Sequence, residues 1–449
     1  MKTFLPLVMV LVQAPLLSAG ETAIQKMVPE PVFGGEMLVR EAGQKNPEMV
    51  LLVHGLGDEA GTTWDGIIGD LALHYHVVAP DLPGFGKSSK GNHLYSPAAY
   101  AQALNILVMS MPAKPLYLVG HSMGGGISLV YAALYGRDLK RLVIVDSVGV
   151  LHRLAVSQYH TKEQINQNLP FIPSGIGNTL GRFSDLLLEK SSRLPVDPDV
   201  ALNSETMRKE ALGANPTRIA ALALVQTDYS LMLGRITTPT WLLWGDKDKV
   251  APMRMARVLQ WNLPRTELTL FSGQGHCPML EDAQGFLAVL ARALSTLPHG
   301  LERVMQKDQT QDLSCSNKNG QILQGSYGTI RITGCKNIRL VNIAAQHIEI
   351  RQSEVEIMHA DITAQGEQPA IRVQQSRLSV TGADIHGHTG IVTNQSRLDL
   401  AGVRFMETPT AIRAEGNDSA LLSSSSVKQF AGKTTAIHIS CPLKAKETL

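Results

Sequence analysis

A corner built around one serine, between a strand pattern and a helix pattern, constrains the fold more than any other stretch. Residues 116–119 form an apolar run typical of a buried strand, residues 120–124 read Gly-His-Ser-Met-Gly, and small residues that can open a helix follow. A strand that turns sharply into a helix strains the corner residue, and Gly120 and Gly124 remove the Cβ atoms that would clash there. The stretch therefore predicts a nucleophile elbow that holds the Ser122 hydroxyl at the end of a sheet.

The chain around this corner, from residue 37 to residue 295, alternates short apolar runs with helical patterns. Near-continuous apolar strands separated by helices indicate a mostly parallel sheet covered on both faces, so we predict an α/β domain over residues 21–298. The predicted strands are residues 48–53, 76–79, 116–119, 142–145, 240–244 and 267–271.

An insertion at about residues 150–235 interrupts this alternation. It is rich in Asn, Ser, Pro and Leu, and it follows the predicted strand that ends at residue 145. Because an insertion at the carboxyl edge of such a sheet lies over the place where ligands bind, we predict a helical cap. The helices expected in it are residues 162–168, 183–190, 205–212 and 218–232.

The last third of the chain is a repeat. After a polar linker at residues 299–312, the pattern Gln-Ser-X-apolar-X-apolar recurs with serines at Ser353, Ser376 and Ser396, 20 to 23 residues apart. Alternating strands at this period are typical of a stacked coil in which each rung buries its apolar face against the next. We therefore predict a second, all-β domain at residues 313–441, a small parallel β-helix or β-solenoid rather than a sandwich.

Length and composition agree with two globular domains. The chain has 449 residues, of which 44% are hydrophobic and 18% charged, which is too long for one ordinary domain and too apolar for a disordered chain. The formal net charge is +2 and only 5% of the residues are aromatic. These values give no support for a nucleic-acid partner or for binding to an anionic membrane surface.

The N-terminus has the pattern of an export signal. Lys2 precedes an apolar run at residues 4–17, and small residues at 18–20 offer a cleavage site before Glu21. The run is too short to span a bilayer comfortably, so we expect a secretory signal peptide at residues 1–20, with an uncleaved anchor as the alternative. The mature protein is then expected in a periplasm or outside the cell.

Four cysteines are present, and three of them fall in the repeat domain. Cys277 follows a histidine and is expected to be a small buried thiol. An exported protein can form disulfides, and we favour Cys315 with Cys335 because both lie near the start of one domain. The pairing among these two and Cys441 stays open, since connectivity cannot be deduced from sequence.

A serine hydroxyl becomes a nucleophile only when a base removes its proton, and the base is oriented by a buried carboxylate. In elbow enzymes the serine, the acid and the histidine follow in that order, each after a strand. The strand at 240–244 runs into Gly-Asp-Lys-Asp at 245–248, and the next strand leads through a glycine-rich loop to His276. Ser122 and His276 are thus the expected nucleophile and base.

Over about residues 36–295 the chain resembles the α/β-hydrolase superfamily, in particular its esterases, lipases and C–C bond hydrolases. The resemblance places the catalytic acid at Asp248, four residues before Pro252, and makes Asp246 a turn residue. Asp146, which follows the preceding strand, is the fallback because some relatives carry the acid there. The matching stretches are residues 54–57, 81–88, 120–124, 245–248 and 275–276.

An oxyanion hole needs two backbone N–H groups aimed at the developing charge. One is expected from the residue after the nucleophile, Met123. The resemblance implies that the second comes from the loop at residues 54–57, from Leu56, and that His54 supports this loop. The segment at residues 81–88 is expected to form a structural turn beside the pocket.

Serine at the elbow implies acyl transfer, because the relatives that open epoxides or remove halide carry aspartate there. We therefore expect an exported serine hydrolase, carboxylesterase-like or lipase-like, that cleaves an ester or related acyl bond with no metal and no cofactor. His386 and His388 are expected in a solvated turn. A C–C bond hydrolase or perhydrolase with the same triad is one alternative; the other is a binding protein whose solenoid contacts glycans or the cell envelope.

Overall fold

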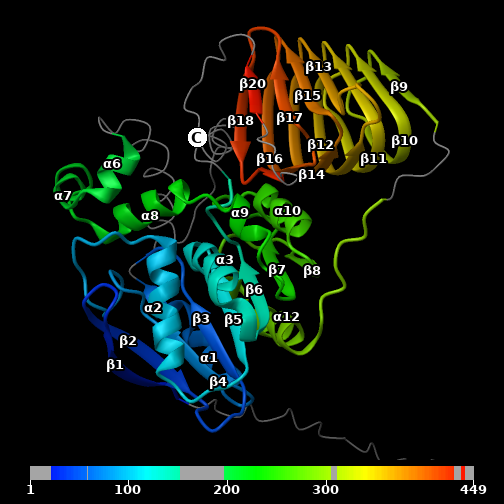
Figure 1. Cartoon of the computed structure of the whole chain (residues 1–449). Coiled ribbons are helices and arrows are strands. Elements are labelled where there is room, and N and C mark those ends of the chain that lie inside the picture. The colour runs from blue at the N-terminus through cyan, green and yellow to red at the C-terminus, as the bar shows by residue number, and fades with distance from the viewer. Residues whose placement is uncertain (1–21, 58, 152–196, 305–310, 429–435, 440–449) are drawn as a thin grey trace, which may run out of the picture.

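The structure is a computed structural model, and it describes residues 22–57, 59–151, 197–304, 311–428 and 436–439. The expected signal peptide, the expected helices at 162–168 and 183–190, and Cys441 lie outside these ranges. Figure 1 shows an α/β domain built from the first two thirds of the chain and a coil of strands built from the last third.

The first domain contains an eight-stranded sheet in the order β1-β2-β4-β3-β5-β6-β7-β8. The six strands from β3 to β8 are parallel to one another, whereas β1 and β2 form an antiparallel pair at one edge. The predicted parallel sheet is therefore confirmed, with two further strands in front of it. The strands are β1 (Ile24–Glu30), β2 (Gly35–Ala42), β3 (Met49–Val53), β4 (His76–Pro80), β5 (Leu116–His121), β6 (Leu139–Val145), β7 (Thr240–Gly245) and β8 (Thr266–Phe271).

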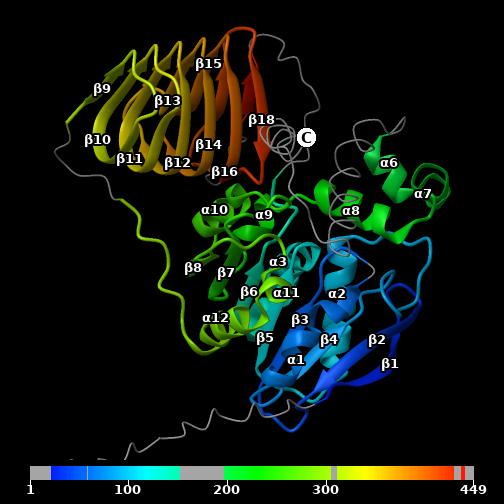
Figure 2. The same ribbon diagram turned by 180° about the vertical axis from the view of Figure 1, so that it is seen from behind.

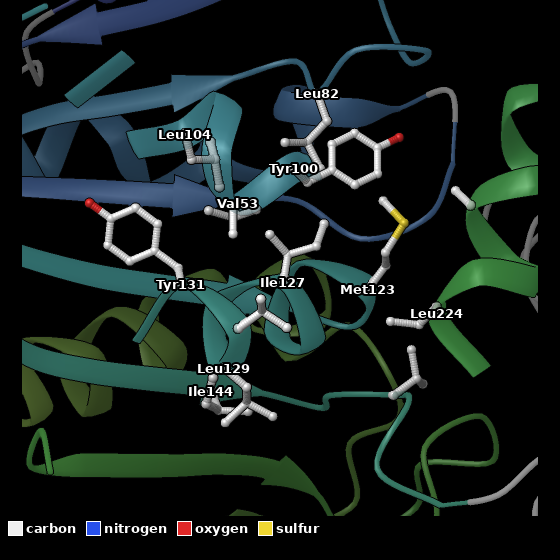
Figure 3. Packing of buried hydrophobic residues seen from close by; sticks show 14 of the residues in the cluster. Val53, Leu82, Tyr100, Leu104, Met123, Ile127, Leu129, Tyr131, Ile144 and Leu224 are labelled. Carbon is white, nitrogen blue, oxygen red and sulfur yellow. The ribbon is translucent and has the colours of Figure 1, made fainter. Parts of the chain in front are cut away.

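Both faces of this sheet are covered, because alternate residues of each strand point to opposite faces. In β3, Leu51 and Val53 join one buried cluster and Val50 and Leu52 join the other. Figure 3 shows Val53 between Leu104 and Ile127 in the first of these clusters. Helices α2 (Pro97–Met109), α3 (Met123–Tyr135) and α10 (Met253–Asn262) pack on that face, and α1 (Asp65–Leu71) and α12 (Ala283–Ser295) pack on the other.

Four described helices lie between β6 and β7, within the predicted cap. The expected helix at 205–212 is α7, and its N-cap Ser204 accepts a hydrogen bond from Met207 N. The expected helix at 218–232 is two helices, because the α8 backbone leaves the helical conformation at Thr227. Leu224 of α8 packs into the core of the first domain. The four helices are α6 (Pro198–Asn203), α7 (Glu205–Leu212), α8 (Pro216–Gln226) and α9 (Ser230–Leu233).

The last third of the chain coils into stacked parallel strands, which confirms the predicted solenoid-like fold (Figure 2). Equivalent apolar residues align from rung to rung, as Val355, Leu378 and Leu398 do across β12, β14 and β16. The strands are β9 (Leu313–Ser316), β10 (Ile322–Thr333), β11 (Ile338–Arg351), β12 (Glu354–Thr363), β13 (Ile371–Gln374), β14 (Arg377–His386), β15 (Thr389–Asn394), β16 (Arg397–Met406), β17 (Thr410–Ala414), β18 (Ser419–Ser423), β19 (Ser426–Lys428) and β20 (Ala436–Ile439).

The repeated serines form a ladder along one corner of the solenoid. Ser353 N donates to Ser376 Oγ at 3.0 Å, and Ser376 N donates to Ser396 Oγ at 3.1 Å. The ladder ends where Ser396 N donates to Asp418 Oδ1 at 2.7 Å. Each rung thus satisfies a buried backbone N–H of the rung before it, which explains why the serine recurs.

The two cysteines favoured as a pair lie next to each other. Cys315 and Cys335 are free thiols with their Sγ atoms 3.1 Å apart, so the disulfide itself stays a prediction. Burial raises the pKa of the Cys315 thiol to about 11. Within the described ranges, no helix combines the length and the apolar character that crossing a membrane requires.

Candidate active site

Ser122 stands at the corner between β5 and α3 with strained backbone angles. Its φ is 54° and its ψ is −118°, in a region that residues other than glycine rarely adopt. A Cβ on Gly120 would overlap the Ser128 hydroxyl, and a Cβ on Gly124 would overlap the Val53 carbonyl oxygen. Only glycine fits at these two positions, so the sequence motif is a direct consequence of the sharp turn.

The structure brings Ser122, Asp248 and His276 together from the loops after β5, β7 and β8. His276 Nε2 lies 2.9 Å from Ser122 Oγ, and His276 Nδ1 lies 2.8 Å from Asp248 Oδ2. With the ring proton on Nδ1, the imidazole donates to the carboxylate and accepts from the serine hydroxyl. All three side chains are buried, so their hydrogen bonds are shielded from water.

The Asp248 carboxylate is held by the loop that it begins. Val250 N and Ala251 N donate to its Oδ1 at 2.7 and 3.0 Å. Burial on its own raises the pKa of Asp248, but the neighbouring His276 and these hydrogen bonds outweigh burial and hold the pKa below its usual value. The carboxylate is therefore ionised at neutral pH and faces the imidazole.

Asp146, the fallback acid, lies beside Asp248 at the end of β6. Its Oδ1 accepts from Gly245 N at 2.9 Å, and carboxylate oxygens of Asp146 and Asp248 lie within 4.8 Å of each other. Complete burial, followed by the nearby Asp248 charge, raises the pKa of Asp146 well above its usual value. The neutral acid form of Asp146 is therefore favoured beside the ionised Asp248, and the hydrogen bonds of the His276 ring go to Asp248 and Ser122.

His121 was not singled out from the sequence, although it stands directly before Ser122. Its Nε2 lies 2.8 Å from the His276 carbonyl oxygen, and the two rings are 4.9 Å apart between centroids. Burial lowers the pKa of His121 to about 3, so the ring is neutral and donates its N–H to that carbonyl. His121 thus holds the backbone of His276.

The two expected oxyanion donors, Met123 and Leu56, belong to segments next to Ser122. Met123 is the first residue of α3, and Figure 3 shows its side chain between Tyr100 and Leu224. A Cβ on Gly55 would lie 3.0 Å from Ser122 Cβ, so the loop that carries Leu56 passes directly beside the nucleophile.

His54 and the segment at 81–88 support that loop. Leu82 N donates to His54 Nε2 at 2.8 Å, and burial lowers the pKa of His54 to about 4, so the ring is neutral. The Asp81 carboxylate accepts from Lys87 N and Gly61 N, both at 2.9 Å, and pairs with Arg40. These contacts make the segment a rigid turn next to the site.

Within the described ranges, one group of side chains has the proximity of a metal site: Asp146, Asp248 and His276, with ligand atoms within 4.8 Å of one another. Asp248 and His276 already direct these atoms at each other, and Asp146 carries a proton. The three therefore fit a hydrogen-bonded set better than a metal centre. Asp246 is exposed, and its Oδ1 accepts from Gly273 N at 2.7 Å, as a turn residue does.

Comparisons with known proteins cover the first domain. A family model described as alpha/beta hydrolase fold matches residues 48–283. An uncharacterized protein of Mycobacterium tuberculosis is 30% identical over 258 residues, which cover 55% of this chain and 75% of that protein. Lipase 1 of Psychrobacter immobilis is 28% identical over 250 residues, covering 55% of this chain and 77% of the lipase. The solved structure of a membrane phospholipase A is 26% identical with a TM-score of 0.44, covering 61% and 87% of the two chains.

Proposed function

Because the chain belongs to the α/β-hydrolase family, we propose that it is a serine hydrolase that cleaves an ester or related acyl bond. The observation that carries the proposal is the chain of hydrogen bonds from Ser122 Oγ through the His276 ring to Asp248, at 2.9 and 2.8 Å. The similarity to a lipase supports an acyl substrate with a lipid-like part.

In the proposed reaction, His276 Nε2 takes the hydroxyl proton while Ser122 Oγ attacks the carbonyl carbon of the ester. Asp248 stabilises the imidazolium that forms. His276 then gives its proton to the departing alcohol, which leaves an acyl group on Ser122. Water, deprotonated by His276, attacks this acyl-enzyme and releases the acid, and the proton returns to Ser122 Oγ.

The negative charge that develops on the carbonyl oxygen is assigned to the N–H groups of Met123 and Leu56. The first amides of a helix have no acceptor within the helix, so Met123 N at the start of α3 is available to an oxyanion. The Gly55 approach to Ser122 supports Leu56 as the second donor.

Active-site labelling tests the proposal. A fluorophosphonate probe reacts with an activated serine, so wild type is expected to label and Ser122→Ala to remain unlabelled while keeping its fold. Product analysis on an ester chain-length panel then separates an esterase from a C–C bond hydrolase or perhydrolase with the same triad. A folded wild type that fails to label would contradict the proposal and favour the solenoid as the functional part.

Export completes the proposed function and rests on the N-terminal sequence alone. Lys2, the apolar run at 4–17 and the small residues at 18–20 support removal of residues 1–20. N-terminal sequencing of protein recovered from a bacterial periplasm or medium is expected to start near Glu21. Full-length protein retained in the cytoplasm would contradict this part of the proposal.

A further inference from the structure

Helix α10 is shared by the two domains. Its residues Met255 and Leu259 are buried in the core of the first domain, together with Val258. On its other side α10 packs against β12, β14 and β16 of the solenoid. Figures 1 and 2 both show α10 directly beneath the solenoid strands. The helix therefore connects the solenoid to the sheet that carries the candidate active site.

One side chain near the start of α10 is held almost entirely by the solenoid. Arg254 Nε donates to Thr381 Oγ1 at 2.8 Å, and Arg254 Nη1 pairs with Asp399 Oδ2 at 2.6 Å. Its Nη2 donates to the carbonyl oxygens of Val380 and Asp399 at 3.1 and 3.2 Å. All three nitrogens of the guanidinium group are thus fixed by β14 and β16.

The other end of α10 is held by a second group of contacts. Trp261 is buried, and its Nε1 donates to Asp384 Oδ1 at 3.2 Å. The His359 ring stacks on Trp261 at 5.4 Å between centroids, and the Arg303 guanidinium lies 3.9 Å from the Trp261 ring centroid. Arg303 and Arg404 both pair with Asp384. The tryptophan is therefore enclosed by side chains of the solenoid and of the segment that precedes it.

The solenoid is shaped to receive this helix. His359, Gly382 and Gly402 occupy equivalent register positions on β12, β14 and β16, and each has a left-handed φ of 58° to 66°. A Cβ on Gly382 would lie 2.6 Å from Trp261 Cβ, and one on Gly402 would lie 2.6 Å from Asn262 Nδ2. The two glycines stand where the helix comes closest, so no side chain at this position of β14 and β16 blocks α10.

The segment leading into α10 is the one that holds the catalytic acid in the proposed mechanism. Val250 N and Ala251 N donate to Asp248 Oδ1, and α10 begins two residues later at Met253. Trp244 Nε1 donates to Ala251 O at 3.0 Å, which ties the segment back to β7. A shift of the first turn of α10 would therefore move the two amides that fix the carboxylate.

We propose, on the basis of the proposed function, that the solenoid is a positioning element of the hydrolase. By clamping Arg254 it fixes the start of α10, and through the amides of Val250 and Ala251 it holds the Asp248 carboxylate against His276. Arg254 is a positioning residue and does not touch the reacting atoms. The solenoid then contributes to turnover, which gives the last third of the chain a role inside the enzyme.

Full-length variants of Arg254 and of its partner Asp399 test this role, with p-nitrophenyl acetate as the substrate and a fluorophosphonate as the active-site label. Arg254→Ala is expected to lower kcat about 10-fold with KM unchanged, because misplacing a catalytic group slows the chemical step more than it weakens binding. Arg254→Lys keeps the charge and part of the contacts and is expected to recover part of the loss. Arg257→Ala is the matched control, because Arg257 Nη1 donates to Gln260 within α10 and the contact of Arg257 with the solenoid is its backbone carbonyl, 3.1 Å from His359 Nε2, which alanine keeps. It should keep the wild-type kcat.

The pH profile separates positioning from a change in charge. In Asp399→Ala the loss of a negative charge alone would move the acidic limb of kcat/KM to lower pH. Loosening the amides on Asp248 weakens the stabilisation of its carboxylate, so the Asp248–His276 couple takes up a proton more readily and the limb moves to higher pH. We expect the upward shift. The titratable groups that act on Asp248 from neighbouring segments are the same in all of these variants: His276, Asp146, His121 and Cys277.

Folded Arg254→Ala and Asp399→Ala proteins with the kcat and pH profile of wild type would overturn the positioning role. An Arg257→Ala protein that loses as much activity as Arg254→Ala would overturn it as well, because the effect would then be one of charge. Failure of the proposed function is a different result, since wild type itself would neither label nor turn over the ester. Each variant is assayed below its own melting temperature, so that a loss of kcat reports on the folded protein.

Discussion

Asp248 in the first domain and Asp418 in the solenoid are both buried aspartates held by backbone amides. Asp248 accepts from two amides of its own loop and from a histidine ring. Asp418 accepts from Ser396 N and Thr393 Oγ1 at 2.7 and 2.9 Å, and from Gly416 N at 3.1 Å. The two carboxylates therefore have similar hydrogen-bond surroundings and differ in the kind of donor.

The difference in donors separates a candidate catalytic carboxylate from a structural one. The donors of Asp418 are amides and a hydroxyl, which keep their protons at physiological pH. The third donor of Asp248 is the imidazole of His276, whose other ring nitrogen contacts Ser122 and can act as a general base. Burial and hydrogen bonding alone would make both residues candidates for the catalytic acid. The contact with the basic side chain of His276 singles out Asp248.

The largest expected effect comes from replacing each of the two aspartates, Asp248 and Asp418, by asparagine. Asp248→Asn should lower kcat/KM for an ester about 10³- to 10⁴-fold, because an amide neither selects the right imidazole tautomer nor stabilises the imidazolium. Asp418→Asn should keep kcat/KM within about 2-fold and lower the free energy of unfolding by about 1–3 kcal/mol, since a buried hydrogen bond is lost. Steady-state kinetics and denaturant unfolding on both variants measure the two quantities.

Asp146→Asn is the control for this pair, because Asn has nearly the size of the protonated acid, is uncharged like it and can still accept from Gly245 N. We expect it to lose less than 10-fold in activity, about the range of a modest positioning change. If Asp248→Asn stayed active while Asp146→Asn lost its activity, the acid would be Asp146, the fallback that the sequence left open.

The sequence predicted the parallel part of the sheet because those strands are continuous apolar runs. It missed β1 and β2 for physical reasons. β1 is an edge strand that is mostly exposed, and β2 carries two buried charges, Arg40 and Glu41, that interrupt its apolar pattern. Their partners, Asp81 and His76, come from elsewhere in the chain, and a local pattern does not contain such pairs.

The candidate site was within reach of sequence because its residues obey a local rule. Ser122, Asp248 and His276 each follow a strand of one parallel sheet, and the carboxyl ends of such strands meet at one edge. The neutral state of Asp146 and the supporting role of His121 could not be predicted from the sequence. They depend on the proximity of Asp248 and on a contact with the His276 carbonyl, which only the folded structure shows.

The docking of the solenoid lay beyond sequence reasoning. The repeat was recognisable because neighbouring rungs satisfy one another at a fixed spacing, as the serine ladder does. The contacts of Arg254 with Thr381 and Asp399 join residues 127 and 145 positions apart, on elements of different kinds. Nothing in the local pattern of α10 distinguishes these side chains from ordinary surface residues.

A second, smaller effect tests whether the two domains are one folding unit. Gly382→Ala places a methyl group 2.6 Å from Trp261 Cβ at a left-handed φ of 66°, and should lower the free energy of unfolding by about 3 kcal/mol through strain and overpacking. Gly366 has a similar φ of 63° with nothing within 4 Å of the added methyl. Gly366→Ala should therefore cost only the conformational strain, about 1 kcal/mol.

Denaturant unfolding followed by tryptophan fluorescence compares the two alanine variants. An excess cost in Gly382→Ala measures the contact between the solenoid and α10. Equal costs in the two variants would mean that the solenoid is not packed tightly on Trp261, and the two domains would then be independent. Asp248 and Asp418 would then belong to two separate folding units.

The smallest effect concerns the third buried carboxyl. The pKa of Asp146 is raised in the folded protein above its unfolded value, first by burial and then by Asp248. The stability that its proton provides is complete below the unfolded pKa, which is about 3.9, and is lost as pH rises toward the folded pKa. Between about pH 5 and pH 6, the free energy of unfolding of wild type should therefore fall relative to that of Asp146→Asn.

Urea unfolding of both proteins at the two pH values measures this difference, and other titrating groups cancel because they are common to the two chains. Asp248 and Glu281 both act on Asp146 electrostatically and remain in the variant. Parallel stability curves would mean that Asp146 is ionised in the folded state. The expected divergence would instead mean that the site holds one protonated aspartate, Asp146, and one ionised aspartate, Asp248. Of the three buried aspartates, only Asp248 then has a role in the proposed reaction; Asp146 and the solenoid's Asp418 do not.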